Sequence, residues 1–245
     1  MAITAVTVLL FVLVGDHATR PAVQKVDDAW LEGMQAVRVA PLTWVAKILD
    51  VLGGVWITAP LRVVLGLWLA HRRRWAHLTA LLLAVAISEA GIGLLKDLVE
   101  RPRPPSPLVD TSGFSFPSGH ATAGAVSALA LVIMVLPPGP ARWAWEVRAV
   151  LFTLVMALSR TYLQAHWLSD AVAGTLFGTA VVLISVVVVI GLRNRLRPRL
   201  FPDAPLPRPP QHPPARRRRP TDSASSVAGA TRGRRSRRQG SGARR

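Results

Sequence analysis

Long runs of apolar residues constrain most strongly what this chain can fold into. Hydrophobic residues make up 51% of its 245 residues, and they gather in segments of membrane-spanning length. A helix needs about 20 apolar residues to cross a bilayer core of roughly 30 Å. Six segments reach or approach that length: Ala2–Val14, Leu42–Ala70, Trp75–Leu95, His120–Leu136, Ala144–Leu158 and Leu168–Leu192. The sequence therefore predicts an all-α bundle of six transmembrane helices over residues 1–192.

The first segment, Ala2–Val14, is short for a span, because its 13 residues cover only about 20 Å as a helix. Either the helix continues through Gly15 to Ala18, or the chain starts upstream of Met1. A cleaved signal peptide is less favoured, since no Lys or Arg precedes the apolar run.

The positions of Lys and Arg in the loops predict how the bundle is oriented. His71–Arg74 and Arg142 lie in the second and fourth connections, and an Arg-rich segment follows the last span. Because positively charged loops stay in the cytoplasm, these loops and both chain ends are expected there. The remaining loops, Gly15–Pro41, Lys96–Gly119 and Ser159–His166, are then extracytoplasmic.

Residues Val23–Val37, in the first extracytoplasmic loop, are predicted to form a short amphipathic helix. Apolar side chains recur there every three or four residues, at Val23, Val26, Trp30, Met34 and Val37. Such a helix lies either in the membrane interface, beside the substrate entrance, or against the bundle. The pattern favours neither.

Residues 193–245 differ in composition from the rest of the chain. They hold 16 Arg against Asp203 and Asp222, so that this segment carries +14 of the total net charge of +17. Frequent Pro, Ser and Gly predict a disordered cytoplasmic tail. Its arginines are expected to bind anionic lipid head groups, and nucleic acid is the less favoured partner.

The first cluster of polar residues lies at the extracytoplasmic end of the third span. Lys96 and Arg103 are seven residues apart, and nearby prolines stop the helix between them. Arg103 therefore lies on a stiff segment that can turn back toward Lys96 and help to bind an anion. An interface anchor is the plainer interpretation of a charge at the end of a span. Arg101-Pro102 repeats the pattern, so chemistry alone does not choose between the two arginines.

The second cluster, Pro117-Ser118-Gly119-His120, directly precedes the fourth span. Ser118 is a favourable N-cap, and Gly119 lets a ligand approach the backbone closely. The free N–H groups at a helix start bind anions, and His120 adds a titratable proton at the same place. An ordinary capped helix with an interfacial histidine would show the same residues.

The third cluster is Ser159-Arg160, followed by His166 and Asp170. His166 and Asp170 are four residues apart, so they share a face if the last helix begins near His166. A carboxylate bound to one imidazole nitrogen leaves the other nitrogen available as a nucleophile. A structural pair is the alternative, because an acid in an apolar helix needs a partner.

Together the three clusters place cations, helix N–H donors, two histidines and a carboxylate on one predicted side of the membrane. In order, they are Lys96-x6-Arg103-Pro104, Pro117-Ser118-Gly119-His120 and Ser159-Arg160-x5-His166-x3-Asp170. These patterns resemble the three signature motifs of the type 2 phosphatidic acid phosphatase (PAP2) family, whose fold is shared with vanadium haloperoxidases. Every motif position is present, the resemblance spans roughly Leu42 to Leu192, and the family spacing selects Arg103 over Arg101.

The resemblance implies a histidine-based phosphatase that needs no metal and no other cofactor. His166 would attack phosphorus, Asp170 would orient it, and His120 would protonate the leaving oxygen and then activate water. The expected phosphate ligands are Lys96, Arg103, Ser118, Gly119 and Arg160. Substrates of the family include phosphatidic acid, phosphatidylglycerol phosphate and undecaprenyl-type diphosphates. A site on the extracytoplasmic side of the plasma membrane is expected to act on lipids of this kind. A phosphotransferase acting on a lipid or sugar hydroxyl is the alternative.

Two acidic residues inside predicted spans have local interpretations. Asp50 is expected to pair with Lys47, three residues earlier in the sequence. Glu89 is expected to form a structural hydrogen bond, and pairing with a basic group or tuning of the site is the less favoured interpretation.

Overall fold

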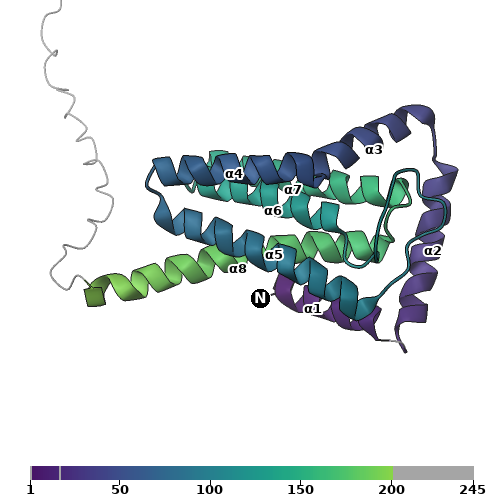
Figure 1. Ribbon diagram of the computed structural model, residues 1–245, viewed down its shortest axis with the longest axis horizontal. Coiled ribbons are helices and arrows are strands. Elements are labelled where there is room, and N and C mark those ends of the chain that lie inside the picture. The colour runs from purple at the N-terminus through teal and green to yellow at the C-terminus, as the bar shows by residue number, and fades with distance from the viewer. Residues whose placement is uncertain (1, 17, 201–245) are drawn as a thin grey trace, which may run out of the picture. The chain divides into compact units, whose positions relative to one another are not determined.

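The computed structural model describes residues 2–16 and 18–200, and this part of the chain is all-helical (Figure 1). Its helices are α1 (Ala2–Gly15), α2 (Arg20–Ala36), α3 (Ala40–Gly53), α4 (Val55–His71), α5 (Trp75–Val99), α6 (Gly119–Val135), α7 (Pro140–Tyr162) and α8 (Leu168–Leu200). The predicted fold class is therefore confirmed. Residues 201–245 lie outside the described residues, so the disordered tail and its lipid contacts stay predictions.

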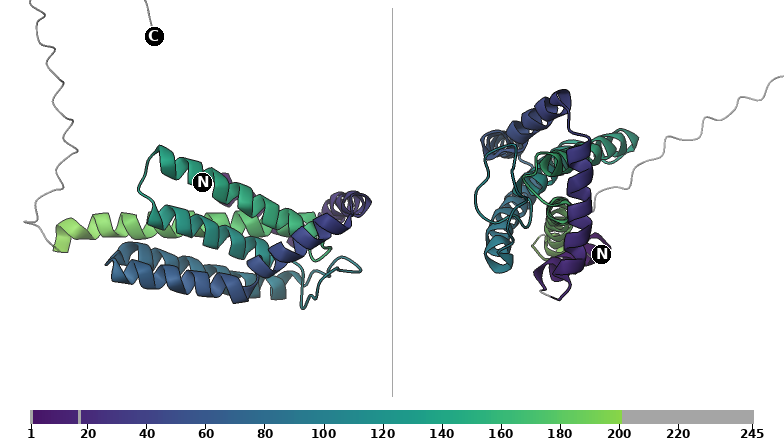
Figure 2. Two further views of the ribbon diagram at one scale, coloured as in Figure 1. Left: turned by 90° about the horizontal axis from the view of Figure 1, so that it is seen from above. Right: turned by 90° about the vertical axis from the view of Figure 1, so that its right-hand side faces the viewer.

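The bundle is organised around α6, which packs against α7 and α8 and also touches α3, α4 and α5. The amphipathic helix predicted near Val23–Val37 is confirmed as α2, which lies across one end of the bundle (Figures 1 and 2). We call this the α2 end. Helix α5 ends here, and α6 and α8 begin here. Trp30 of α2 donates its Nε1–H to Thr161 Oγ1 of α7 at 3.1 Å, so α2 packs against the bundle.

Two of the described helices are long and apolar enough to cross a membrane by themselves: α5, and α8 over Leu168–Leu196. Two further spans result if the bent pairs α1–α2 and α3–α4 each count as one. Helix α6 is apolar but has only 17 residues. The described helices thus fit a membrane protein, while the number of six spans stays a prediction.

The predicted continuous helix over Leu42–Ala70 is wrong, because the chain bends by 46° between α3 and α4. The bend falls at Gly53 and Gly54, where the chain passes close to α6 and α7. A Cβ atom at Gly53 would lie 2.7 Å from Met156 Sδ and 3.0 Å from His120 Cδ2. Apolar composition predicts a membrane segment, but it does not reveal this bend.

Two other predicted boundaries differ from the structure because helices extend past their apolar runs. Helix α7 covers Pro140–Tyr162 rather than Ala144–Leu158, so Arg160 lies on its last turn instead of in a loop. Helix α8 continues to Leu200 instead of ending at Leu192. Polar residues such as Arg have good helix propensity, so the end of an apolar run does not end a helix.

Helices α6 and α8 cross closely at Gly174 and Gly178, which are four residues apart on α8. A Cβ at Gly174 would lie 2.5 Å from the carbonyl oxygen of Ser118, and one at Gly178 would lie 2.7 Å from that of Thr122. Small residues at this spacing let the backbones of membrane helices approach each other. The crossing fixes the start of α6 beside the first turn of α8.

We expect Gly174→Ala to destabilise the protein by about 1–3 kcal/mol, because the added methyl group must push α8 away from the Ser118 carbonyl. Thermal unfolding in detergent, followed by circular dichroism, measures the effect. Gly191→Ala on the same helix is the control, since a Cβ there would meet no atom within 4 Å. Equal melting temperatures for the two variants would contradict the close crossing.

Candidate functional site

The three polar motifs meet at the α2 end of the bundle. Lys96 lies on the last turn of α5, His120 on the first turn of α6, and Arg160 on the last turn of α7. His166 lies in the α7–α8 connection, and Asp170 lies in the first turn of α8. The two histidines therefore share one end of the bundle. The Ser118 N–H joins the second and third motifs directly, because it donates to the Asp170 carbonyl oxygen at 3.0 Å.

His166 and Asp170 face each other across the start of α8. Because α8 begins at Leu168, His166 precedes the helix and lies in the turn before it. Its Nδ1 lies 3.6 Å from Asp170 Oδ2, which is longer than a hydrogen bond. The same Oδ2 accepts the Trp167 N–H at 2.9 Å, in the manner of a carboxylate in a capping box. Asp170 thus caps its own helix and also lies beside the imidazole.

The other nitrogen of His166, Nε2, faces the cations of the site. It lies 3.2 Å from Nη1 of Arg103, and the whole side chain is 3% exposed. Burial lowers the pKa of His166 to about 4 against the opposing effect of Asp170, and Arg103 and Arg160 add to the decrease. The ring is therefore neutral at pH 7, with a nitrogen lone pair available for attack.

Arg103 is held in place by backbone carbonyl groups. It donates to the carbonyl oxygens of Ser112, Gly113 and Phe114 in the α5–α6 loop, at 2.7, 2.9 and 3.2 Å. It also donates to Ala165 at 2.7 Å, next to His166. Burial and the nearby Arg160 lower the pKa of Arg103. A bound anion would offset the repulsion between these two cations.

The start of α6 offers backbone donors beside these cations. Ser118 is the N-cap as predicted, and its Oγ accepts the Ala121 N–H at 3.4 Å. The N–H groups of Gly119 and His120 have no partner within their helix, because they lie in its first turn. A Cβ at Gly119 would meet no atom within 4 Å, so the backbone here faces open space. This geometry suits an anion bound at the helix start.

Asp50 is a site residue that sequence reasoning missed. The predicted pair with Lys47 is wrong, because Asp50 forms its ion pair with Arg160 through Oδ1. His120 Nε2 lies 3.3 Å from the same Oδ1 and 3.1 Å from the Asp50 carbonyl oxygen. The bend after α3 brings Asp50 over His120, and no local spacing in the sequence indicates that contact.

Arg101 and Arg103, between which chemistry alone does not choose, have different surroundings. Arg101 is 1% exposed and forms ion pairs with Asp27 and Asp170. Both terminal nitrogens of its guanidinium are bound by side chains, Nη1 by Ser169 and Asp170 and Nη2 by Asp27, whereas Arg103 faces His166. The geometry thus favours Arg103 as the arginine that meets a substrate.

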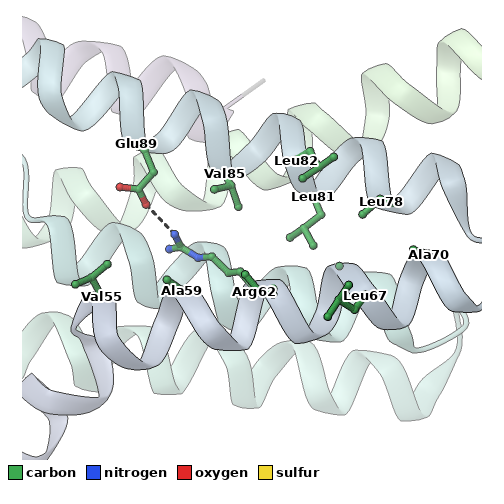
Figure 3. A pocket seen from close by; sticks show the side chains of 12 residues that line it. Val55, Ala59, Arg62, Leu67, Ala70, Leu78, Leu81, Leu82, Val85 and Glu89 are labelled. Atoms are coloured by element: carbon green, nitrogen blue, oxygen red, sulfur yellow. Dashed lines mark hydrogen bonds and ion pairs between the residues drawn. The ribbon is translucent and has the colours of Figure 1, made fainter.

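A cavity of about 590 Å³ lies between α4 and α5 and is lined mainly by aliphatic side chains (Figure 3). Arg62 and Glu89 point toward each other across it and form an ion pair at 2.7 Å. Arg62 also donates to Ser127 Oγ on α6 at 3.0 Å. Glu89 therefore pairs with a basic group, which is the interpretation that the sequence favours less than a structural hydrogen bond.

Across residues 2–16 and 18–200, no group of three or more His, Asp or Glu side chains is arranged to hold a metal ion. The charges of the site come instead from arginine, lysine and the carboxylates beside them. Such a donor set suits an anionic ligand.

The sequence pattern of the PAP2 superfamily matches residues 77–194, which run from α5 into α8 and contain all three motifs. Phosphatidylglycerophosphatase B of Bacillus subtilis is 30% identical over 177 residues, covering 69% of this chain and 86% of that protein. Decaprenylphosphoryl-5-phosphoribose phosphatase of Mycobacterium tuberculosis is 36% identical over 142 residues, covering 53% and 68%. An undecaprenyl-diphosphatase of Sulfolobus acidocaldarius is 33% identical over 73 residues, covering 30% and 32%.

Solved structures show the same fold. The crystal structure of a transmembrane PAP2-type phosphatidylglycerolphosphate phosphatase from Bacillus subtilis is similar with a TM-score of 0.68 and 25% identity, covering 80% of this chain and 96% of that one. LpxE of Aquifex aeolicus is similar in fold, with a TM-score of 0.53 at 21% identity over 64% and 92% of the two chains.

Proposed function

The chain belongs to the PAP2 superfamily and is a membrane lipid phosphatase, and we propose that it hydrolyses a lipid phosphate monoester or diphosphate through a phosphohistidine. One observation carries the proposal: His120, His166 and Arg103 converge at the start of α6. A neutral imidazole beside fixed cations and free N–H groups is what in-line attack on a phosphoryl group requires.

In the first proposed step, the lone pair of His166 Nε2 attacks phosphorus and the bond from phosphorus to the lipid oxygen breaks. His120 gives a proton to that oxygen as it leaves. Asp170 stabilises the imidazolium that forms, and we expect the 3.6 Å gap to Nδ1 to shorten as the charge develops. Lys96, Arg103 and Arg160 bind the equatorial oxygens, together with Ser118 and the Gly119 N–H.

In the second proposed step, His120 takes a proton from water and the resulting hydroxide attacks phosphorus. The bond from phosphorus to Nε2 breaks, inorganic phosphate leaves, and His166 returns to its neutral form. In this scheme Arg160 binds phosphate oxygens with part of its guanidinium and gives up part of its ion pair with Asp50. Asp50, which also touches His120, orients the imidazole of His120 as acid in the first step and as base in the second.

The α4–α5 cavity supports a lipid substrate. Its wall is apolar except for Arg62 and Glu89, and it begins at Val55, just after the bend that places Asp50 over His120. We place the hydrocarbon chain there and the phosphate at the α2 end, on the extracytoplasmic side of the plasma membrane. The substrate classes are those named for the relatives: phosphatidylglycerol phosphate, undecaprenyl diphosphate and decaprenylphosphoryl-5-phosphoribose.

Phosphate release by the purified protein from a panel of these lipids tests the proposal. Hydrolysis of at least one lipid phosphate, and of none by a His166→Ala sample prepared in parallel, is the expected result. An active wild-type protein whose His166→Ala variant is equally active would refute the assigned nucleophile.

Activity is expected to persist in EDTA, because arginine, lysine and N–H groups supply the stabilisation that a metal would provide. Phosphate release with and without the chelator, on protein purified without added metal, gives the measurement. Complete loss in EDTA that Mg²⁺ restores would contradict this electrostatic scheme.

A further inference from the structure

A buried network of charges connects helix α2 to Asp170. Arg101 Nη1 lies 2.7 Å from Asp170 Oδ1, and Arg101 Nη2 lies 2.6 Å from Asp27 Oδ2. Ser169 Oγ lies between them, 2.6 Å from both Arg101 Nη1 and Asp27 Oδ2. The side chains of Asp27, Arg101 and Asp170 are 1%, 1% and 0% exposed.

This network contains two carboxylates and only one guanidinium. Burying charges is unfavourable unless they are paired, and removing one partner of a buried pair leaves an uncompensated charge. Asp27 and Arg101 together are neutral, so Asp170 keeps its full negative charge beside His166. Without Asp27, the positive charge of Arg101 would oppose the negative charge of Asp170.

We propose that Asp27 is a positioning residue for phosphoryl transfer, which shares Arg101 with Asp170 and thereby keeps the Asp170 charge available to His166. The proposal rests on the function proposed above for His166 as nucleophile. It extends the machinery to α2, which lies outside residues 77–194 matched by the family pattern.

The charge of the network matters because attack by His166 converts a neutral imidazole into a cation. That cation is stabilised by Asp170 and opposed by Arg103 and Arg160, which also face the ring. If Asp170 were the one carboxylate paired with Arg101, the positive charge of Arg101 would weaken the stabilisation of the imidazolium by Asp170. The barrier to forming the phosphohistidine should then rise, while the groups that bind substrate stay in place.

Asp27 also makes a contact that would explain its presence if its role were purely structural. Its Oδ1 accepts the Ser169 N–H at 2.8 Å, so it also caps the start of α8. Asparagine at position 27 can keep that contact through its carbonyl oxygen. The Asp27→Asn variant therefore removes the charge and spares the cap, and because its NH2 group replaces Oδ2 it also loses the hydrogen bonds that Arg101 Nη2 and Ser169 Oγ donate there.

The experiment compares kcat and KM of the full-length protein in detergent, for one lipid phosphate that the wild type hydrolyses. We expect Asp27→Asn to lower kcat by about 10- to 100-fold, the range found when an outer partner of a metal-binding histidine is removed, with little change in KM. Glu32→Gln is the matched control, because it removes an exposed carboxylate from the same helix. It should hydrolyse the lipid at the wild-type rate.

A double variant, Asp27→Asn with Arg101→Gln, separates charge from structure. It restores the network's net charge while it removes more buried bonds, so the proposal expects faster turnover than in Asp27→Asn alone. Slower or equal turnover in the double variant would overturn the proposal, as would wild-type kcat in Asp27→Asn.

Thermal unfolding and gel filtration establish that each variant is folded. If Asp27→Asn does not fold, Asp27→Glu and the double variant carry the test, because both keep the wild-type net charge. Both should be active, and inactivity of both as folded proteins would overturn the proposal. A wild type that hydrolyses no lipid phosphate would instead refute the proposed function, so the two failures are distinguishable.

Discussion

Replacing His166 with alanine is expected to reduce lipid phosphate hydrolysis by about 10⁴-fold or more, the loss typical when a nucleophile or its base is removed. His166 Nε2 lies 3.2 Å from Arg103 Nη1, while Nδ1 of the same ring faces Asp170. Without Nε2, the phosphoryl group has no acceptor, although Arg103 and the start of α6 still bind the anion. Initial rates of phosphate release measure the loss.

The control for this prediction is His71→Ala, which removes an exposed histidine from the far end of α4. It should leave both the rate and the melting temperature unchanged. His166→Ala should melt close to the wild type, because the ring lies in a turn and its Nδ1 has no hydrogen-bond partner. A folded His166→Ala protein that retains a tenth of the wild-type rate would rule out His166 as the nucleophile.

Helix content and the meeting of the motifs at one end could be predicted from the sequence, for separate physical reasons. Apolar runs of bilayer length allow little except helices, because backbone groups in lipid must be paired within their own segment. Lys96, His120 and His166 lie at the ends of successive helices, and alternate connections of an up-and-down bundle lie on the same side. The helix ends were predicted less well, since α7 and α8 continue into polar residues.

The pairings of the acidic residues could not be predicted in the same way. Asp50 meets Arg160, and Asp27 meets Arg101, across separations of 110 and 74 residues. These contacts depend on the bend at Gly54 and on how α2 lies across the bundle. Helical spacing suggests partners only three or four residues away, which is why Lys47 was expected for Asp50. The bulk apolarity of a segment carries no information on either contact.

Replacing His120 with glutamine is expected to lower lipid hydrolysis by about 10²- to 10⁴-fold, because both proposed proton transfers depend on the ring. Glutamine can still donate to the Asp50 carbonyl oxygen, which His120 Nε2 approaches at 3.1 Å. The change therefore removes the titrating group and keeps the local contact. The size of the loss should depend on the leaving group, since an aryl phosphate such as p-nitrophenyl phosphate departs without a proton.

With the aryl phosphate, the first step of the His120→Gln enzyme should be fast and the second slow, because water lacks its base. Nitrophenol should then appear in a burst of about one equivalent per enzyme, and ³²P from labelled p-nitrophenyl phosphate should accumulate on the protein. Phosphohistidine survives alkali and is lost in acid, so the quench conditions identify the linkage. The double variant with His166→Ala is the control and should trap no label. A His120→Gln enzyme without a burst, equally slow on aryl and lipid substrates, would show that His120 does not act as the acid and base of this reaction.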